Sequence, residues 1–155
     1  MEPKIVQRKL LAISSGGGHW VQLCRLSAAF RDCDVVYASV DPSYAEDVPG
    51  RRFYSFRNAT RRDRLKLCVL VFEIFLILLR ERPAVVVTTG AAPALIALAL
   101  AKFVFRSRTI WIDSIANCEQ LSTSGTLARK VSDAWLTQWP QLAKSGGPEY
   151  WGAVL

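Results

Sequence analysis

Histidine and cysteine, the usual ligands of structural zinc, are scarce in this sequence. The 155 residues contain a single histidine, His19, and four cysteines, none of which forms a C-x-x-C pair. The spacing of Cys24, Cys33, Cys68 and Cys118 argues against a zinc site, and we expect no metal and no cofactor. No secretory signal is recognisable, because the first apolar run is short and leads into glycines. We therefore expect a reducing, cytosolic environment with free thiols.

The common nucleotide-binding and nucleic-acid-binding fingerprints are missing as well. The first glycine-rich loop, residues 14–19, reads S-S-G-G-G-H, which is neither G-x-G-x-x-G nor G-x-x-x-x-G-K-[ST]. The sequence has no helix-turn-helix, zinc-finger or RRM signature, so nucleic acid is not an expected partner. It also has no internal repeat and no linker. With 51% hydrophobic and 21% charged residues, it predicts one globular domain over residues 1–155.

Short β-branched runs alternate with segments of helical periodicity. Strands are predicted over 9–14, 34–40, 52–56, 84–88, 109–113 and 134–137, and helices over 20–30, 65–79, 91–105 and 126–131. Residues 151–155 are predicted to form a last strand or a connector. Continuously apolar strands separated by helices indicate an α/β fold, a Rossmann-like parallel sheet with helices on both faces.

Two apolar segments raise the question of a membrane. Residues 83–101 carry no charge, but Thr88-Thr89-Gly90 and Pro93 divide them into a strand, a glycine turn and a helix. Residues 67–79 would span about 20 Å as a helix, short of the roughly 30 Å hydrocarbon core. We therefore favour an α/β domain over a membrane-spanning hairpin.

Positive charge is concentrated in one window. The formal net charge is +7, and residues 51–66 supply six of these charges. The window leads directly into the apolar segment 65–79, and basic residues near an anionic leaflet contribute about 1 kcal/mol each. We predict peripheral association with an anionic membrane surface, with a solvated basic loop as the alternative. The predicted membrane-binding residues are Arg57, Arg61, Arg62, Arg64, Lys66, Phe72 and Phe75.

The glycine loop follows a strand and opens a helix, which is where α/β sheets place their ligands. Free backbone N–H groups at a helix N-terminus favour phosphate. His19 lies at that terminus, where the helix dipole disfavours the imidazolium, so a neutral imidazole can act as a general base or contact substrate. The alternatives are a plain turn, a structural histidine and a capping aspartate. The predicted acceptor- or phosphate-binding residues are Ser15, Gly16, Gly17, Gly18, Thr89, Gly90 and Asp113.

Several short motifs resemble one known group of proteins in their order and spacing. The motifs are Ile112-Asp113-Ser114, Leu121-Ser122-Thr123-Ser124-Gly125, Ser132-Asp133-Ala134, Thr137-Gln138-Trp139 and Tyr150-Trp151-Gly152. They resemble the acceptor half of split GT-B glycosyltransferases, which includes the membrane-associated subunit of the eukaryotic dolichol-linked N-acetylglucosaminyltransferase and bacterial PssD-like exopolysaccharide proteins. The S-G-G-G-H loop is similar to the first glycine loop of GT-B enzymes related to the MurG lipid II synthase, of glycosyltransferase family 28 type. The resemblance covers residues 9–155.

The resemblance implies the Rossmann-like N-terminal half of a GT-B enzyme. It implies a subunit of an inverting hexosyl, N-acetylhexosaminyl or uronosyl transferase that is inactive without its partner. In this interpretation the chain binds a polyprenyl-pyrophosphate-linked saccharide. His19 then orients or deprotonates the hydroxyl of that saccharide that attacks the donor sugar. A nucleotide-sugar-binding catalytic subunit of similar size supplies the UDP-sugar, because 155 residues make about half of a GT-B enzyme. The implied partner-interface residues are Gln138, Trp139, Tyr150 and Trp151.

The implied location is peripheral, on the cytoplasmic face of the inner (plasma) membrane. The eukaryotic subunits carry an N-terminal anchor that this sequence lacks, so we expect attachment through the internal basic and apolar surface. Many members also have Glu-Ser and then arginine where this sequence has Asp113-Ser114 and then Asn117. One alternative function is a non-catalytic membrane adaptor that recruits a complete glycosyltransferase. Another is a self-sufficient small nucleotide-binding enzyme.

Overall fold

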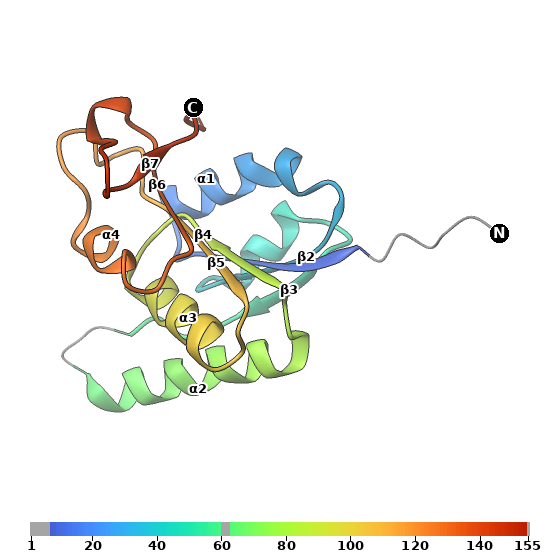
Figure 1. Ribbon diagram of the computed structural model, residues 1–155. Coiled ribbons are helices and arrows are strands. Elements are labelled where there is room, and N and C mark those ends of the chain that lie inside the picture. Colours follow the sequence, from blue (N-terminus) through green and yellow to red (C-terminus); the bar gives the residue numbers. More distant parts are fainter. Residues whose placement is uncertain (1–6, 60–62, 155) are drawn as a thin grey trace.

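The computed structural model describes residues 7–59 and 63–154. At its centre is a seven-stranded sheet in the order β3-β2-β1-β4-β5-β6-β7, in which every pair of neighbours is parallel (Figure 1). The α/β Rossmann-like fold predicted from the sequence is thereby confirmed. The strands are β1 (Arg8–Ile13), β2 (Cys33–Ser39), β3 (Arg52–Ser55), β4 (Val85–Thr88), β5 (Arg108–Ile112), β6 (Ala134–Thr137) and β7 (Glu149–Tyr150).

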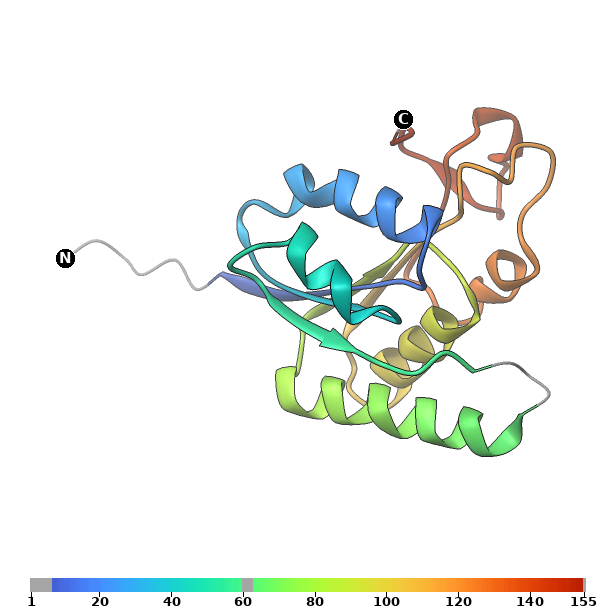
Figure 2. The same ribbon diagram turned by 180° about the vertical axis from the view of Figure 1, so that it is seen from behind.

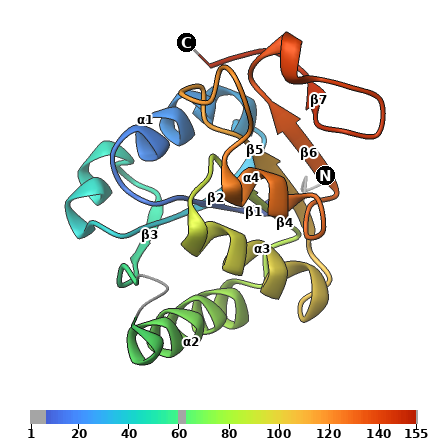
Figure 3. The same cartoon turned by 90° about the vertical axis from the view of Figure 1, so that its left-hand side faces the viewer.

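Helices cover both faces of this sheet, as a parallel sheet requires. Figures 2 and 3 show α1 on one side of the sheet, and α2 and α3 on the other. The α-helices are α1 (Gly18–Arg25), α2 (Arg64–Glu81), α3 (Ala92–Phe103) and α4 (Thr123–Ala128), and the 3₁₀ helices are η1 (Leu26–Phe30), η2 (Pro42–Asp47) and η3 (Pro140–Leu142).

The strand side chains alternate between two hydrophobic cores. Leu11 of β1 and Val86 of β4 face the core under α2 and α3, whereas Leu10 and Val87 face the core under α1. Burial on both faces is why these strands read as continuous apolar runs. The uncharged segment 83–101 forms β4, a turn and most of α3, as the sequence predicts. Among the described residues, no helix has the length and hydrophobicity needed to cross a bilayer.

Helix α2 runs back along the sheet, opposite in direction to the strands. It begins after Asp63, whose side chain accepts a hydrogen bond from the backbone N–H of Lys66. It ends at Arg82, which has a left-handed φ of 44° and precedes a proline. The buried carboxylate of Glu81, in the last turn, lies 3.1 Å from the ammonium of Lys9 at the start of β1. The first turn of α2 therefore lies toward the edge of the sheet where the strands end.

Three boundaries differ from the sequence prediction. The helix predicted over 20–30 is α1 followed by the 3₁₀ helix η1, because the last turn tightens after Arg25. The helix predicted over 126–131 starts earlier, at Thr123, because the Ser122 hydroxyl caps it by accepting from the backbone N–H of Gly125 (2.8 Å). The last strand is β7, and residues 151–154 form no regular element.

Candidate functional site

Two loops meet at the carboxyl edge of the sheet, where the strand order reverses. Strand β1 pairs with β2 on one side and with β4 on the other, so the loops after β1 and β4 leave the sheet next to each other. Open α/β sheets bind their ligands at this position. The residues predicted to bind phosphate, Ser15 to Gly18 and Thr89-Gly90, fall on these two loops.

The first loop leads directly into the N-terminus of α1. Gly17 has a φ of +66°, a conformation that glycine adopts without strain, and no side chain caps the helix that follows. The first amide groups of α1, beginning at the exposed residue Gly18, are therefore left without a capping side chain. Such groups, together with the helix dipole, favour a phosphate or another anion.

An aromatic stack that no local sequence pattern reveals supports this loop. The hydroxyl of Tyr44, in η2, accepts a hydrogen bond from the backbone N–H of Gly17 at 2.9 Å. The Tyr44 ring lies parallel to the Trp20 ring, with centroids 4.9 Å apart. Trp20 in turn donates its indole N–H to Asp47 at 2.7 Å. One clue in the sequence is the tyrosine in the D-P-S-Y turn, although its partners lie 24 to 27 residues away.

His19 joins the first loop to the second through two hydrogen bonds. Its Nδ1 lies 2.9 Å from the backbone oxygen of Thr89, and the Thr89 hydroxyl donates to the backbone oxygen of His19 at 2.6 Å. Gly90 has a φ of +124°, and a Cβ at this position would lie 2.8 Å from Cε1 of His19. Gly90 therefore supplies both a backbone conformation and a space that another residue would not.

In the second loop, the groups predicted to contact phosphate directly are instead hydrogen-bonded within the protein. The Thr89 side chain is buried and its hydroxyl is engaged with His19, while the backbone N–H of Gly90 donates to the Thr88 hydroxyl at 3.1 Å. Both groups therefore shape the loop rather than face a ligand. Ser15 similarly contributes its backbone oxygen within the fold, accepting from the hydroxyls of Ser14 and Ser39.

Asp113, at the end of β5, orders the next loop. It is 2% exposed, and its carboxylate accepts hydrogen bonds from the hydroxyl and the backbone N–H of Ser122 at 2.7 and 3.0 Å. The Asn117 amide and the Trp111 indole also donate to it, at 3.1 and 3.3 Å. A side chain on Gly125 would collide with this carboxylate. Asp113 thus holds Ser122, the residue that caps α4, as the structural alternative for this aspartate expected. Its predicted role in acceptor binding stays a prediction.

Gln22 and Gln138 form a buried amide network beside Asp113. Gln22 Oε1 accepts from the backbone N–H of Ile115 at 3.0 Å and from Nε2 of Gln138 at 2.8 Å, and its own Nε2 donates to Ser114 at 3.1 Å. The partner contact predicted for Gln138 is wrong, because this side chain is 2% exposed and its hydrogen-bonding groups are used inside the fold. Gln22 is not among the predicted site residues, and its signal in the sequence is an uncharged polar residue within the apolar periodicity of 20–30.

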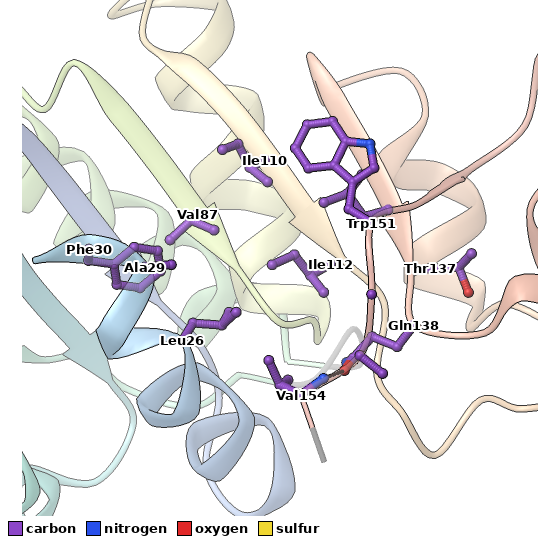
Figure 4. Close-up of a pocket in the computed structure, with 13 residues that line it drawn as sticks. Leu26, Ala29, Phe30, Val87, Ile110, Ile112, Thr137, Gln138, Trp151 and Val154 are labelled. Carbon is purple, nitrogen blue, oxygen red and sulfur yellow. Dashed lines mark hydrogen bonds between the residues drawn. The ribbon is translucent and has the colours of Figure 1, made fainter.

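The other predicted partner residues lie at the β6–β7 edge. Trp139 is half-buried and donates its indole N–H to the backbone oxygen of Ile115 at 2.7 Å, whereas Tyr150 and Trp151 are exposed. Trp151 and Val154 border an apolar cavity of about 340 Å³ on the α1 side of the sheet (Figure 4). The floor of this cavity is made by strand side chains that include Val87, Ile110, Ile112 and Leu136.

The predicted membrane-binding residues divide into three groups. Arg61 and Arg62 lie outside the described residues. Arg57, Arg64 and Lys66 are exposed, although Arg57 pairs with Glu73 at 3.3 Å and Lys66 with Asp63 at 3.1 Å. Phe72 is 60% exposed, whereas Phe75 is half-buried and packs against Phe105 with ring centroids 5.6 Å apart.

The structure adds four residues to this surface. The outward face of α2 carries exposed apolar side chains and one thiol at helical spacing: Leu65, Cys68, Phe72, Leu76 and Leu79, here called the α2 stripe. Leu65 alone is 82% exposed. The low polarity of residues 65–79 on every side of the helix was the sequence signal for this stripe. Removing this stripe from water, against an apolar surface or in the interfacial region of a membrane, would be energetically favourable.

The described residues give little support for a cysteine nucleophile, a metal site or a functional role of Asp133. Burial and, secondarily, the charge of Asp47 raise the pKa of the Cys24 thiol to about 11, so this cysteine on α1 stays protonated and is a poor nucleophile. Among the described residues, no three His, Cys, Asp or Glu side chains are grouped as metal ligands would be. Asp133, treated as structural from its sequence context, accepts from the backbone N–H of Thr109 at 2.9 Å and pairs with Lys102 at 2.8 Å.

Comparison with known proteins gives one family. Residues 65–154, more than half of the chain, match the model of the family described as "Oligosaccharide biosynthesis protein Alg14 like". Two curated proteins named "UDP-N-acetylglucosamine transferase subunit ALG14" are similar. The one from Debaryomyces hansenii is 34% identical over 83 residues (50% of this chain, 36% of that protein), and the one from Yarrowia lipolytica is 35% identical over 83 residues (49% and 38%). The matched region thus spans under two fifths of these relatives.

Solved structures share the fold at low identity. MurG from Acinetobacter baumannii superposes with a TM-score of 0.73 at 11% identity, covering 92% of this chain and 45% of that one. A UDP-GlcNAc 2-epimerase from Methanocaldococcus jannaschii gives 0.61 at 16% identity, covering 83% and 39%. In each case this chain corresponds to somewhat under half of a larger enzyme.

Proposed function

The chain belongs to the Alg14-like family of oligosaccharide biosynthesis proteins, and from this premise we propose that it is the acceptor-binding subunit of a two-component UDP-N-acetylglucosamine-type transferase. The observation that carries the proposal is the position of His19. The imidazole lies between the two loops at the switch point of a sheet with the fold of half a GT-B enzyme. A second polypeptide would supply the nucleotide-sugar site, opposite these two loops.

In the proposed reaction, the chain binds a polyprenyl-pyrophosphate-linked saccharide. The uncapped N-terminus of α1, with Gly16 and Gly18, holds the pyrophosphate, while Gly17, whose N–H is bonded to Tyr44, shapes the loop around it. His19 accepts the proton of the attacking saccharide hydroxyl as its oxygen bonds to the anomeric carbon of the donor sugar. The bond from that carbon to the UDP oxygen breaks, and UDP leaves with the bonding pair. Attack opposite the leaving group inverts the anomeric configuration.

The proposed contact with the catalytic partner is the β6–β7 edge. Trp151 is 67% exposed and borders the apolar cavity. Tyr150 precedes it on β7 and is also exposed. Large aromatic side chains are the residues that contribute most to protein interfaces when a partner covers them. Trp139 would support this edge from beneath through its bond to Ile115.

The proposed membrane contact is the α2 stripe together with the cations beside it. Arg64 and Lys66 lie in the first turn of α2, which is directed toward the carboxyl edge that carries His19. The stripe would enter the interfacial region while these cations meet anionic headgroups. A domain seated in this way would keep its acceptor site close to the bilayer that holds the lipid-linked substrate. We propose peripheral attachment to the cytoplasmic face of the plasma membrane.

Affinity purification of a tagged copy from its native cells tests the two-subunit proposal. The expected result is a stoichiometric companion, identified by mass spectrometry, with a nucleotide-sugar-binding fold. Recovery of the chain without such a companion under mild detergent would contradict it. Tight binding of a UDP-sugar by the chain alone would instead indicate a self-contained enzyme. If His19→Ala keeps full transfer activity while Arg64→Gln with Lys66→Gln abolishes it, the chain is a membrane adaptor.

A further inference from the structure

The His19–Thr89 contact determines which ring nitrogen of the imidazole can accept a proton. A backbone carbonyl oxygen only accepts hydrogen bonds, so the 2.9 Å contact with the Thr89 oxygen requires Nδ1 to carry a hydrogen. In the neutral ring the other nitrogen, Nε2, then holds a lone pair. Nε2 makes no hydrogen bond to any residue within 7–59 or 63–154.

We infer that Thr89 is a positioning residue that fixes the Nδ1–H tautomer of His19 and leaves Nε2 free to accept the proton of the acceptor hydroxyl. The inference rests on the proposed function for the identity of that hydroxyl, but the tautomer itself does not depend on it. During transfer, the hydroxyl proton moves to Nε2 and the ring becomes an imidazolium, whose charge the Thr89 carbonyl stabilises through Nδ1–H. The Nε2 proton passes to solvent after the products leave.

Three features of the second loop hold this geometry. The Thr89 hydroxyl, which is buried, donates to the His19 backbone oxygen at 2.6 Å, so the two residues are linked by a reciprocal pair of bonds. Gly90 leaves space for the ring, because a Cβ there would lie 2.9 Å from Nδ1. The Thr88 hydroxyl accepts from the backbone N–H of Gly90 and sets the turn. A ring held on both sides in this way loses little orientation freedom when substrate arrives.

The presence of a single histidine makes the tautomer directly measurable. In long-range ¹H–¹⁵N spectra of the labelled full chain, recorded under conditions where the spectra show the neutral ring, only one side-chain ring contributes. We expect the wild-type chain to show a protonated Nδ1 and an unprotonated Nε2. A predominantly Nε2–H ring in the folded wild-type chain would overturn the inference without any variant.

Substitutions at residue 89 separate positioning from general structure. Thr89→Val removes the hydroxyl and should shift the ring toward a mixture containing the Nε2–H form, whereas Thr89→Ser should restore the wild-type spectrum. Thr126→Val is the matched control. Thr126, on α4, also donates its hydroxyl to a backbone oxygen, that of Ser122. A Thr89→Val spectrum identical to wild type would contradict the role of the hydroxyl. If Thr89→Val does not fold, Gly90→Ala, which crowds the ring directly, replaces it with the same expectation.

Kinetics with the companion subunit add an independent readout. We expect Thr89→Val to lower kcat about two- to fivefold, in proportion to the lost Nδ1–H population, with little change in KM for the acceptor. Thr89→Ser should recover the rate. An equal loss in both variants would argue for a merely structural threonine. If no companion gives transfer, the proposed function fails while the tautomer result still stands or falls on the spectra.

Discussion

The side-chain amides of Gln22 and Gln138 are hydrogen-bonded at 2.8 Å although 116 residues separate them in the chain. Gln22 lies one turn after His19 on α1, and Gln138 directly follows β6. Their bond, with the further bond from Gln138 to the backbone oxygen of Asp113 (2.9 Å), ties the helix that presents the histidine to the loops after β5 and β6. The helix that presents His19 is therefore held in place by buried side chains outside the two glycine loops.

The amide pair should be energetically coupled. We expect Gln22→Ala and Gln138→Ala each to lower the free energy of unfolding by about 1–3 kcal/mol, because each leaves buried polar groups unpaired. The double variant should lose less than the sum, by about 0.5–3 kcal/mol. Urea unfolding of the four proteins measures this cycle, with exposed Gln120→Ala as the neutral control. Strict additivity would show that the two amides act separately.

Glu81 should make stability depend on pH. Burial raises the pKa of its carboxyl, but the Tyr54 hydroxyl at 2.6 Å and the charges of Lys9 and Arg52 outweigh burial and hold the pKa below the usual 4.5. The folded state therefore binds this proton more weakly than the unfolded state. The resulting stability is present above about pH 5 and is lost as the pH falls through 4.5 toward the lowered value.

Replacement of this carboxylate isolates its share of the acid sensitivity. Glu81→Gln should cost about 2 kcal/mol at pH 7, since it removes charged hydrogen bonds, and the difference from wild type should shrink at pH 4. Chemical unfolding at the two pH values measures it, and Glu119→Gln, at an exposed position, controls for net charge. A difference between Glu81→Gln and wild type that is as large at pH 4 as at pH 7 would contradict the assignment.

The α2 stripe should be protected by lipid. Cys68 lies within the stripe and Cys118 is exposed on a loop, so the chain contains both a probe and an internal reference. With anionic liposomes at low salt, we expect a water-soluble maleimide to label Cys68 at least several-fold more slowly, while the rate at Cys118 is unchanged. Peptide mass spectrometry reads the two sites separately.

Substitution within the stripe should weaken binding to the same liposomes. Large apolar side chains contribute about 1.5–3 kcal/mol each when fully buried, so Leu65→Ser with Phe72→Ser should reduce flotation about tenfold or more. Val21→Ser removes an exposed apolar side chain from α1, on the opposite side of the sheet, and should leave flotation unchanged. Equal losses in both variants, or equal labelling of the two cysteines, would place the membrane contact elsewhere.

The parallel fold could be predicted because the central strands are local apolar runs between turns. Residues 84–88 illustrate this, since their β-branched series is readable without knowledge of any neighbour. The loops after β1 and β4 followed from the same local signals, and so did His19 between them. Helix α4 was misplaced because its start depends on the single hydroxyl of Ser122, which the apolar pattern does not register.

Contacts between distant segments could not be predicted in the same way. Tyr44 supports Gly17 across 27 residues, and Gln138 reaches Gln22 across 116, so neither pairing leaves a trace in local periodicity. Exposure was also ambiguous where a helix is apolar on every side. Phe72 and Phe75 look alike in the sequence, yet only Phe72 is mostly exposed, because α3 and Phe105 cover the other face of α2.

The most direct test is transfer of labelled N-acetylglucosamine from UDP-N-acetylglucosamine to a polyprenyl-pyrophosphate-linked saccharide. The assay would contain this chain, its captured companion, or both. We expect transfer only with both polypeptides, and a loss of about 10²–10⁴-fold in kcat for His19→Ala with capture of the companion unchanged. Full transfer by the companion alone, or a wild-type rate for His19→Ala, would contradict the proposal that this chain supplies the acceptor half of the active site.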